Sequence, residues 1–212
     1  MLNPFPVSSA AREIFDEISR DAPRLPLTCG SAKASEALNR LRRLSDSELL
    51  GSEIGDVRMA QCVRAGLLLR SDQFEESHAI SQNIDTPEGS YWHGILHRRE
   101  PDASNAKYWF RGVGSHPLFA ALATPPEGTS SSSAAVTATA LSHVLRDGLW
   151  DPIRFVDLCA SAGILEQNGN RGGEQRPTRA ELEDLQELEI RALLRYCYSG
   201  AVNGPMKLRR DA

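Results

Sequence analysis

Two pairs of basic residues at helical spacing mark the stretch 90–119 as a place where chemistry could occur. His93 and His97 are four residues apart, and so are Lys107 and Arg111. Residues four apart on a helix share one face, so both members of a pair can reach one ligand. Imidazoles bind metal ions or anions, whereas a lysine beside an arginine favours a carboxylate or a phosphate. The spacing therefore predicts a binding site. Whether this site binds a metal ion or an anion depends on the surrounding groups.

A helical hairpin is needed to bring the two pairs together. A helix over 91–100 places both histidines opposite an apolar face, and a second helix over 103–113 leaves the lysine and the arginine on its polar side. In an antiparallel hairpin the two polar sides would face each other across one groove, closed at its end by a third histidine. The residues predicted to line this groove are His93, His97, Asn105, Lys107, Tyr108, Arg111 and His116.

A metal site is an alternative for the same groove. His93 and His97, with either His116 or Glu100 as the third ligand, would suit a catalytic zinc or iron ion. However, the spacing lacks the glutamate of the H-E-x-x-H motif. The basic side chains between positions 98 and 111 would also each repel a divalent cation, by on the order of 1 kcal/mol when poorly screened.

Three functions follow in order of expectation. The first is a site, with or without catalysis and without a cofactor, for a small anionic or polar ligand. The first alternative is a non-catalytic scaffold that holds a peptide in the groove. The second alternative is a metal-dependent enzyme that uses His93 and His97.

The remaining conspicuous side chains are expected to be structural. Single histidines on helices are mostly structural or surface residues, and His78 and His143 are interpreted in this way. The charged run 98–100 is interpreted as a solvated helix end. Aromatic residues on the faces predicted to be buried are assigned to the core; they are Tyr91, Trp92, Trp109 and Phe110.

An internal repeat indicates how the helices are arranged. The segment 65–80 parallels 93–110, with Gly66 against Gly94 and Arg70 against Arg98. Each copy predicts a helix, a polar turn and a second helix. Such a unit is similar to a tetratricopeptide hairpin, in which a small residue lets the second helix approach and hairpins stack on a shared core. An irregular stack of helical hairpins is therefore expected.

Capping residues and apolar periodicity predict helices through the rest of the chain as well. A turn is expected at 85–89 and a flexible surface loop at 167–177, and the tail 203–212 is expected to be frayed. No alternating strand pattern is found, so the predicted fold is all-α, with a single domain over 1–212, a helical-hairpin core at about 56–123 and C-terminal helices at 134–200. The predicted helices cover 10–20, 31–43, 46–54, 57–70, 74–81, 91–100, 103–113, 118–123, 134–146, a segment from 152, and 178–199.

Composition limits the class of protein. A net charge of -4 provides no broad basic surface for nucleic acid. No apolar run approaches the roughly 20 residues of a membrane span, and no leader segment is apparent, so a cytoplasmic protein is expected. The four cysteines are widely spaced, which predicts buried, reduced thiols.

The central stretch resembles a known family. The segments Y-W-H-G-I-L-H-R-R-E-P-D and S-N-A-K-Y-W-F-R-G-V-G-S-H-P are similar to the signature of an uncharacterised family of bacterial and fungal proteins. The resemblance covers about residues 65–119 and continues more weakly at 150–159 and in the last helix. It implies an important central motif and carries no assigned activity. Ala103 and Gly112 stand where the resemblance implies an aromatic residue and an arginine, which predicts looser packing of the hairpin.

Overall fold

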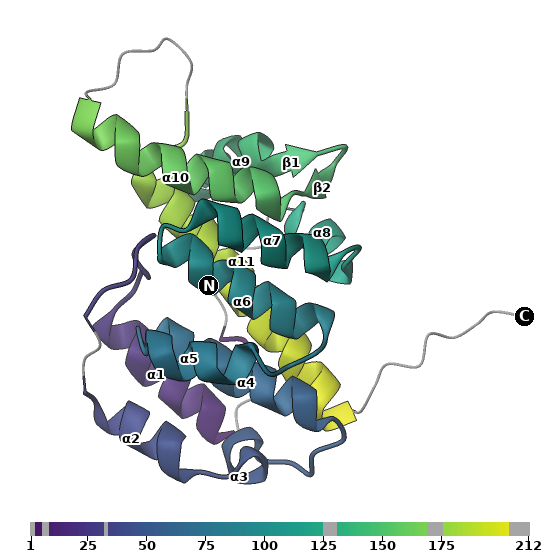
Figure 1. Ribbon diagram of the computed structural model, residues 1–212. Helices are drawn as coiled ribbons and strands as arrows, with labels where there is room; N and C mark the ends of the chain where they lie inside the picture. Colours follow the sequence, from purple (N-terminus) through teal and green to yellow (C-terminus); the bar gives the residue numbers. More distant parts are fainter. Residues whose placement is uncertain (1–2, 6–8, 32–33, 125–130, 169–175, 204–212) are drawn as a thin grey trace, which may run out of the picture.

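The structure is a bundle of helices with one very short β-hairpin (Figure 1). A computed structural model describes residues 3–5, 9–31, 34–124, 131–168 and 176–203. The prediction of an all-α fold is confirmed, while the predicted tail and most of the predicted loop at 167–177 lie outside the described residues. The helices are α1 (Ala10–Asp21), α2 (Glu36–Arg43), α3 (Asp46–Leu50), α4 (Val57–Arg70), α5 (Phe74–Ser81), α6 (Pro87–Arg99), α7 (Ala103–Val113), α8 (Pro117–Leu122), α9 (Ser131–Val144), α10 (Pro152–Asn168) and α11 (Arg179–Asn203).

Helix boundaries follow the capping residues more closely than the apolar pattern. The α6 helix begins earlier than predicted, because Thr86 caps it through the amide of Gly89 and Pro87 occupies its first turn. The predicted turn at 85–89 is therefore wrong. Gly89 is required there, since an added Cβ would lie 2.2 Å from the carbonyl oxygen of Ile84. Likewise α2 begins after its cap Ser35 and not at residue 31.

One strand pair departs from the expected all-helical pattern. Strands β1 (Leu145–Arg146) and β2 (Leu149–Trp150) pair antiparallel around Asp147 and Gly148. Both turn residues have positive φ, 52° and 76°, which a tight hairpin requires. The predicted helix over 134–146 therefore ends at Val144, and the sequence Asp-Gly is the signal for the turn.

Two hairpins and one long helix organise the core. Helices α4 and α5 form the first hairpin, and α6 and α7 form the second. Helix α11 packs against α4 and also against α8, α9 and α10 (Figure 1). None of the helices in the described ranges has the length and hydropathy that a bilayer crossing requires.

The repeat-related glycines make different contacts in the two hairpins. An added Cβ on Gly94 would lie 3.0 Å from the ring of Phe110 in α7, so this glycine does let the second helix of its hairpin approach. An added Cβ on Gly66 would meet Trp92 of α6 at 2.5 Å and Leu194 of α11 at 2.7 Å. The expectation that each glycine serves its own hairpin is therefore wrong for Gly66, which contacts the neighbouring hairpin and α11.

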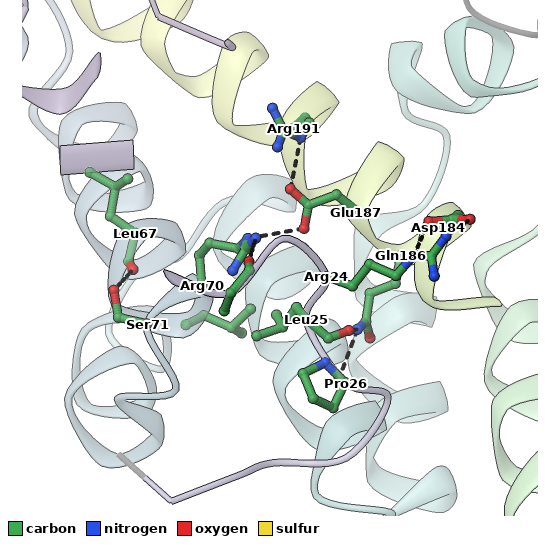
Figure 2. A network of polar contacts seen from close by, with 12 residues as sticks. Arg24, Leu25, Pro26, Leu67, Arg70, Ser71, Asp184, Gln186, Glu187 and Arg191 are labelled. Carbon is green, nitrogen blue, oxygen red and sulfur yellow. Dashed lines mark hydrogen bonds and ion pairs between the residues drawn. The ribbon is translucent and has the colours of Figure 1, made fainter. Parts of the chain in front are cut away.

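The repeat-related arginines, in contrast, are equivalent. Arg70 forms an ion pair with Glu187 at 2.9 Å, and Arg98 forms one with Glu189 at 2.6 Å. All four side chains are at most 2% exposed. Figure 2 shows the pair of Arg70 and Glu187, in which Glu187 also forms an ion pair with Arg191 at 2.7 Å. The interpretation of residues 98–100 as a solvated helix end is therefore wrong for Arg98 and Arg99, which are both buried. Glu189 on α11 compensates the charge of Arg98, and Asp72 compensates that of Arg99.

We expect Glu189→Gln to lower the free energy of unfolding by about 3–5 kcal/mol, because Arg98 would keep a buried charge without a counter-charge. Urea denaturation measures this loss. Glu36→Gln is the control, because it breaks an ion pair whose side chains are 63–67% exposed and should leave the curve nearly unchanged. Combining Arg98→Met with Glu189→Leu should recover most of the stability; an undiminished loss in that double variant would contradict the charge explanation.

Candidate functional site

Three histidines from two helices meet between the hairpins. His93 and His97 project from α6, and His78 from α5 joins them. The ring centroids are 4.6 Å apart for His78 and His93, 5.6 Å for His78 and His97, and 4.8 Å for His93 and His97. One nitrogen from each ring lies within 4.8 Å of the other two. We call these three residues the histidine cluster.

The sequence predicted two members of the histidine cluster and missed the third. His78 was interpreted as a structural or surface residue because no helical spacing links it to another histidine. Only the packing of α5 against α6 brings it to His93. Its ring also stacks on Phe74, one turn earlier in α5.

His93 is held in an apolar setting. The residue is 2% exposed, and its Nδ1 has no hydrogen-bond partner among the described residues. The ring of Trp109 stacks on it with centroids 3.9 Å apart. Burial lowers the pKa of His93 to about 4, and the neighbouring His97 and His78 contribute to this shift. His93 is therefore neutral at physiological pH, with a lone pair available to an electrophile.

The orientation of His97 is set by a carboxylate. Its Nδ1 lies 2.8 Å from Oε2 of Glu100, so Nδ1 carries the proton and Nε2 the lone pair. The Nδ2 atom of Asn105 lies 3.1 Å from Nε2 and 3.3 Å from Nδ1. With its proton on Nδ1, the ring accepts a hydrogen bond from the Asn105 amide at Nε2. A ligand at Nε2 would have to displace this uncharged donor.

The predicted opposition of the two basic pairs is wrong. Lys107 forms an ion pair with Asp157 of α10 at 2.5 Å, and Arg111 is exposed. The α7 residues that face the histidines are Asn105 and Trp109. Positions 107 and 111 lie about 200° further round the helix from 105 and 109, which directs them away from α6. Apolar periodicity had assigned Trp109 to the buried face of α7. This assignment placed the polar side of α7 toward Lys107 and Arg111 instead of toward Asn105.

The other predicted groove residues are also dispersed. His116 accepts a hydrogen bond from the amide of Leu118 at the start of α8, and its Nε2 lies 3.5 Å from Oε1 of Glu88. Its ring contacts Tyr91, on the face of α6 opposite the histidine cluster. Tyr108 is 65% exposed. The structure therefore keeps His93, His97 and Asn105 together, replaces His116 with His78, and places Glu100 against His97 rather than beside a metal position.

No protein-family model, curated protein or solved structure matches the chain. The resemblance of the central stretch to a bacterial and fungal family therefore stays a prediction. What the site can do has to be inferred from its own geometry.

We expect His93 to make the protein less stable in acid. Its pKa is lowered in the folded state, so the unfolded chain binds more protons between pH 6.5 and about 4. Its contribution to stability is complete above pH 6.5 and is lost as the pH falls to about 4, up to about 3 kcal/mol in total. Urea denaturation at several pH values should show this pH-dependent difference between the native chain and His93→Gln, but not between the native chain and His143→Gln. Parallel curves for the native chain and His93→Gln would contradict it.

Proposed function

We propose that the protein binds a divalent transition-metal ion through His78, His93 and His97. The observation that carries the proposal is the convergence of three imidazole nitrogens within 4.8 Å. In addition, no side-chain hydrogen bond joins His78 or His93 to a described residue. A metal ion would take the Nε2 lone pair of His97 from Asn105, which is an uncharged donor. Imidazole ligands suit zinc, copper, iron and nickel.

The required adjustment is small. Zn–N distances of 2.0–2.1 Å place the nitrogens of a tetrahedral site about 3.3 Å apart, so the histidine cluster would contract by about 1.5 Å at most. His78 is half-buried and can supply this movement, whereas His93 is held by Trp109 and His97 by Glu100.

The electrostatic argument against a metal loses most of its force in the folded chain. Arg98 pairs with Glu189, Arg99 with Asp72 at 2.6 Å, and Lys107 with Asp157. These carboxylates offset charges that the sequence alone would set against a cation. The same pairing argues against the anionic-ligand groove, because Lys107 is already engaged.

A three-histidine site leaves one tetrahedral position for water or a substrate atom, as in catalytic zinc sites. A zinc ion there would supply Lewis acidity to whatever occupies that position. The chain's own contribution is to hold three imidazoles from two hairpins at one point. Metal binding would therefore also tie α5 to α6.

We expect the metal-free, untagged protein to bind Co²⁺ or Zn²⁺ with one-to-one stoichiometry, detected by calorimetry and by the visible absorption of tetrahedral Co²⁺. Because only the folded chain presents the histidine cluster, metal at one hundred times Kd should stabilise it by about 2.7 kcal/mol. His78→Ala, His93→Ala and His97→Ala should each abolish the absorption band, while His143→Ala should retain it. Unchanged binding by a folded His78→Ala protein would refute the three-histidine site.

We expect Glu100→Gln to weaken metal binding by about 10- to 100-fold, because a carboxylate that accepts from the other ring nitrogen orients a metal-bound histidine and raises its basicity. Competition with a chromogenic chelator measures this change. Glu53→Gln, an exposed position before α4, is the matched control. Equal affinities for the native chain and Glu100→Gln would mean that His97 is not a ligand through Nε2.

A further inference from the structure

A segment without helix or strand between α1 and α2 is held by side chains as a bound peptide would be. We call residues 22–30 the strap. Its carbonyl groups accept hydrogen bonds from three side chains that are at most 2% exposed, two of them drawn in Figure 2. The pairs are Arg70 to Ala22 (2.6 Å), Gln186 to Leu25 (3.0 Å) and Pro26 (3.1 Å), and Arg99 to Pro26 (3.1 Å) and Thr28 (3.3 Å).

Buried and exposed side chains alternate in the middle of the strap. Leu25 and Leu27 are buried, at 1% and 4% exposed, while Pro26 between them is exposed. Arg24 makes two hydrogen bonds to Asp184 of α11, at 2.6 and 2.9 Å. The segment thus presents an arginine, an apolar residue, a proline and a second apolar residue in register.

The binding groups suit a proline-containing chain. Arg70, Arg99 and Gln186 all donate to carbonyl oxygens, and proline lacks an N–H but keeps its carbonyl group. Extended proline-containing peptides are commonly recognised in this way, through free carbonyl groups and alternating apolar contacts. We call the surface formed by these three side chains and Asp184 the strap site.

The strap leaves part of its apolar site unfilled. A cavity of about 90 Å³ lies beside Leu27 and Thr28. Its other walls include Arg98, Ala103, Val156 and Cys159. A larger apolar residue at the position of Leu27 would occupy space that the strap leaves empty.

We propose that the strap site is a recognition surface for a partner segment of the type arginine–apolar–proline–bulky apolar, and that the strap occupies it in the unbound protein. The strap competes with such a partner at the high effective concentration of a tethered segment. A partner with a bulkier residue in place of Leu27 overcomes this competition by filling the cavity. The inference is independent of the histidine cluster.

Two labelled peptides test the proposal by fluorescence anisotropy. One carries residues 22–30 with Cys29→Ser, and the other adds Leu27→Phe. The receptors are the full-length native chain and its Arg24→Ala/Leu27→Ala variant, in which the strap is weakened and the strap site is intact. We expect the variant to bind both peptides at least tenfold more tightly than the native chain, and the phenylalanine peptide about tenfold more tightly than the leucine peptide.

Asp184→Ala in the weakened-strap background provides the matched control. Arg24, the strap residue that pairs with Asp184, is already removed in that background. Any loss of peptide affinity therefore comes from the contact between Asp184 and the arginine of the added peptide. We expect about a fivefold loss for both peptides. If the double variant does not fold, Arg24→Ala alone replaces it, because this change removes only a half-exposed side chain. The single variant must then show the same order of peptide affinities.

Several results would overturn the proposal. One is a folded weakened-strap variant that binds neither peptide at millimolar concentration. Another is a phenylalanine peptide that binds no better than a scrambled one. A dimer of the variant that forms with rising concentration and resists added peptide would assign the strap site to a second copy of the chain instead.

Discussion

The buried ion pairs between α11 and the two hairpins are the constraint on which the rest of the structure depends. Burial opposes the charge of each arginine. It lowers the pKa of Arg70, whereas the pKa of Arg98 is raised because Glu189, Cys159 and Tyr91 together outweigh the effect of burial. A buried ion pair contributes little net stability, but it makes other registers costly, because any slip would leave a charge without its partner. Glu187 and Glu189 thus fix how α11 lies along both hairpins.

This constraint also determines which elements the different faces of α6 contact. Arg98 is directed to α11, and Arg99 is directed to the strap and to Asp72. With these side chains committed, the helix presents His93 and His97 to α5 and α7. The histidine cluster is therefore a consequence of the same orientation of α6 that satisfies its arginines, and the aromatic contact with Trp109 then secures it.

Local signals in the sequence were sufficient to locate most helices, though not all of their starts, and two of the three histidines of the cluster. Capping residues and apolar spacing located α4 and α5 correctly, and helical geometry placed both α6 histidines on one face. What failed were long-range pairings. Glu189 is 91 residues from Arg98, so a charged run at a helix end looked solvated. Trp109 looked like a core residue, yet it is half-buried and lies over a histidine, which reversed the inferred polar side of α7. Neither partner can be found from periodicity, because each depends on how separate helices pack.

Helix α6 connects the two proposed sites, and this connection has a thermodynamic consequence. His97 would be a metal ligand, whereas Arg99, two residues later, donates to the strap. Between them Arg98 borders the cavity beside Leu27. A partner that displaces the strap exchanges the strap carbonyl groups that accept from Arg99 for its own, and any resulting shift of α6 reaches the histidine cluster through its backbone. If strap release changes metal affinity, metal must change partner affinity by the same factor, because coupling between two binding equilibria is reciprocal. The buried ion pair of Arg98 limits this coupling, since it holds α6 to α11 in both states.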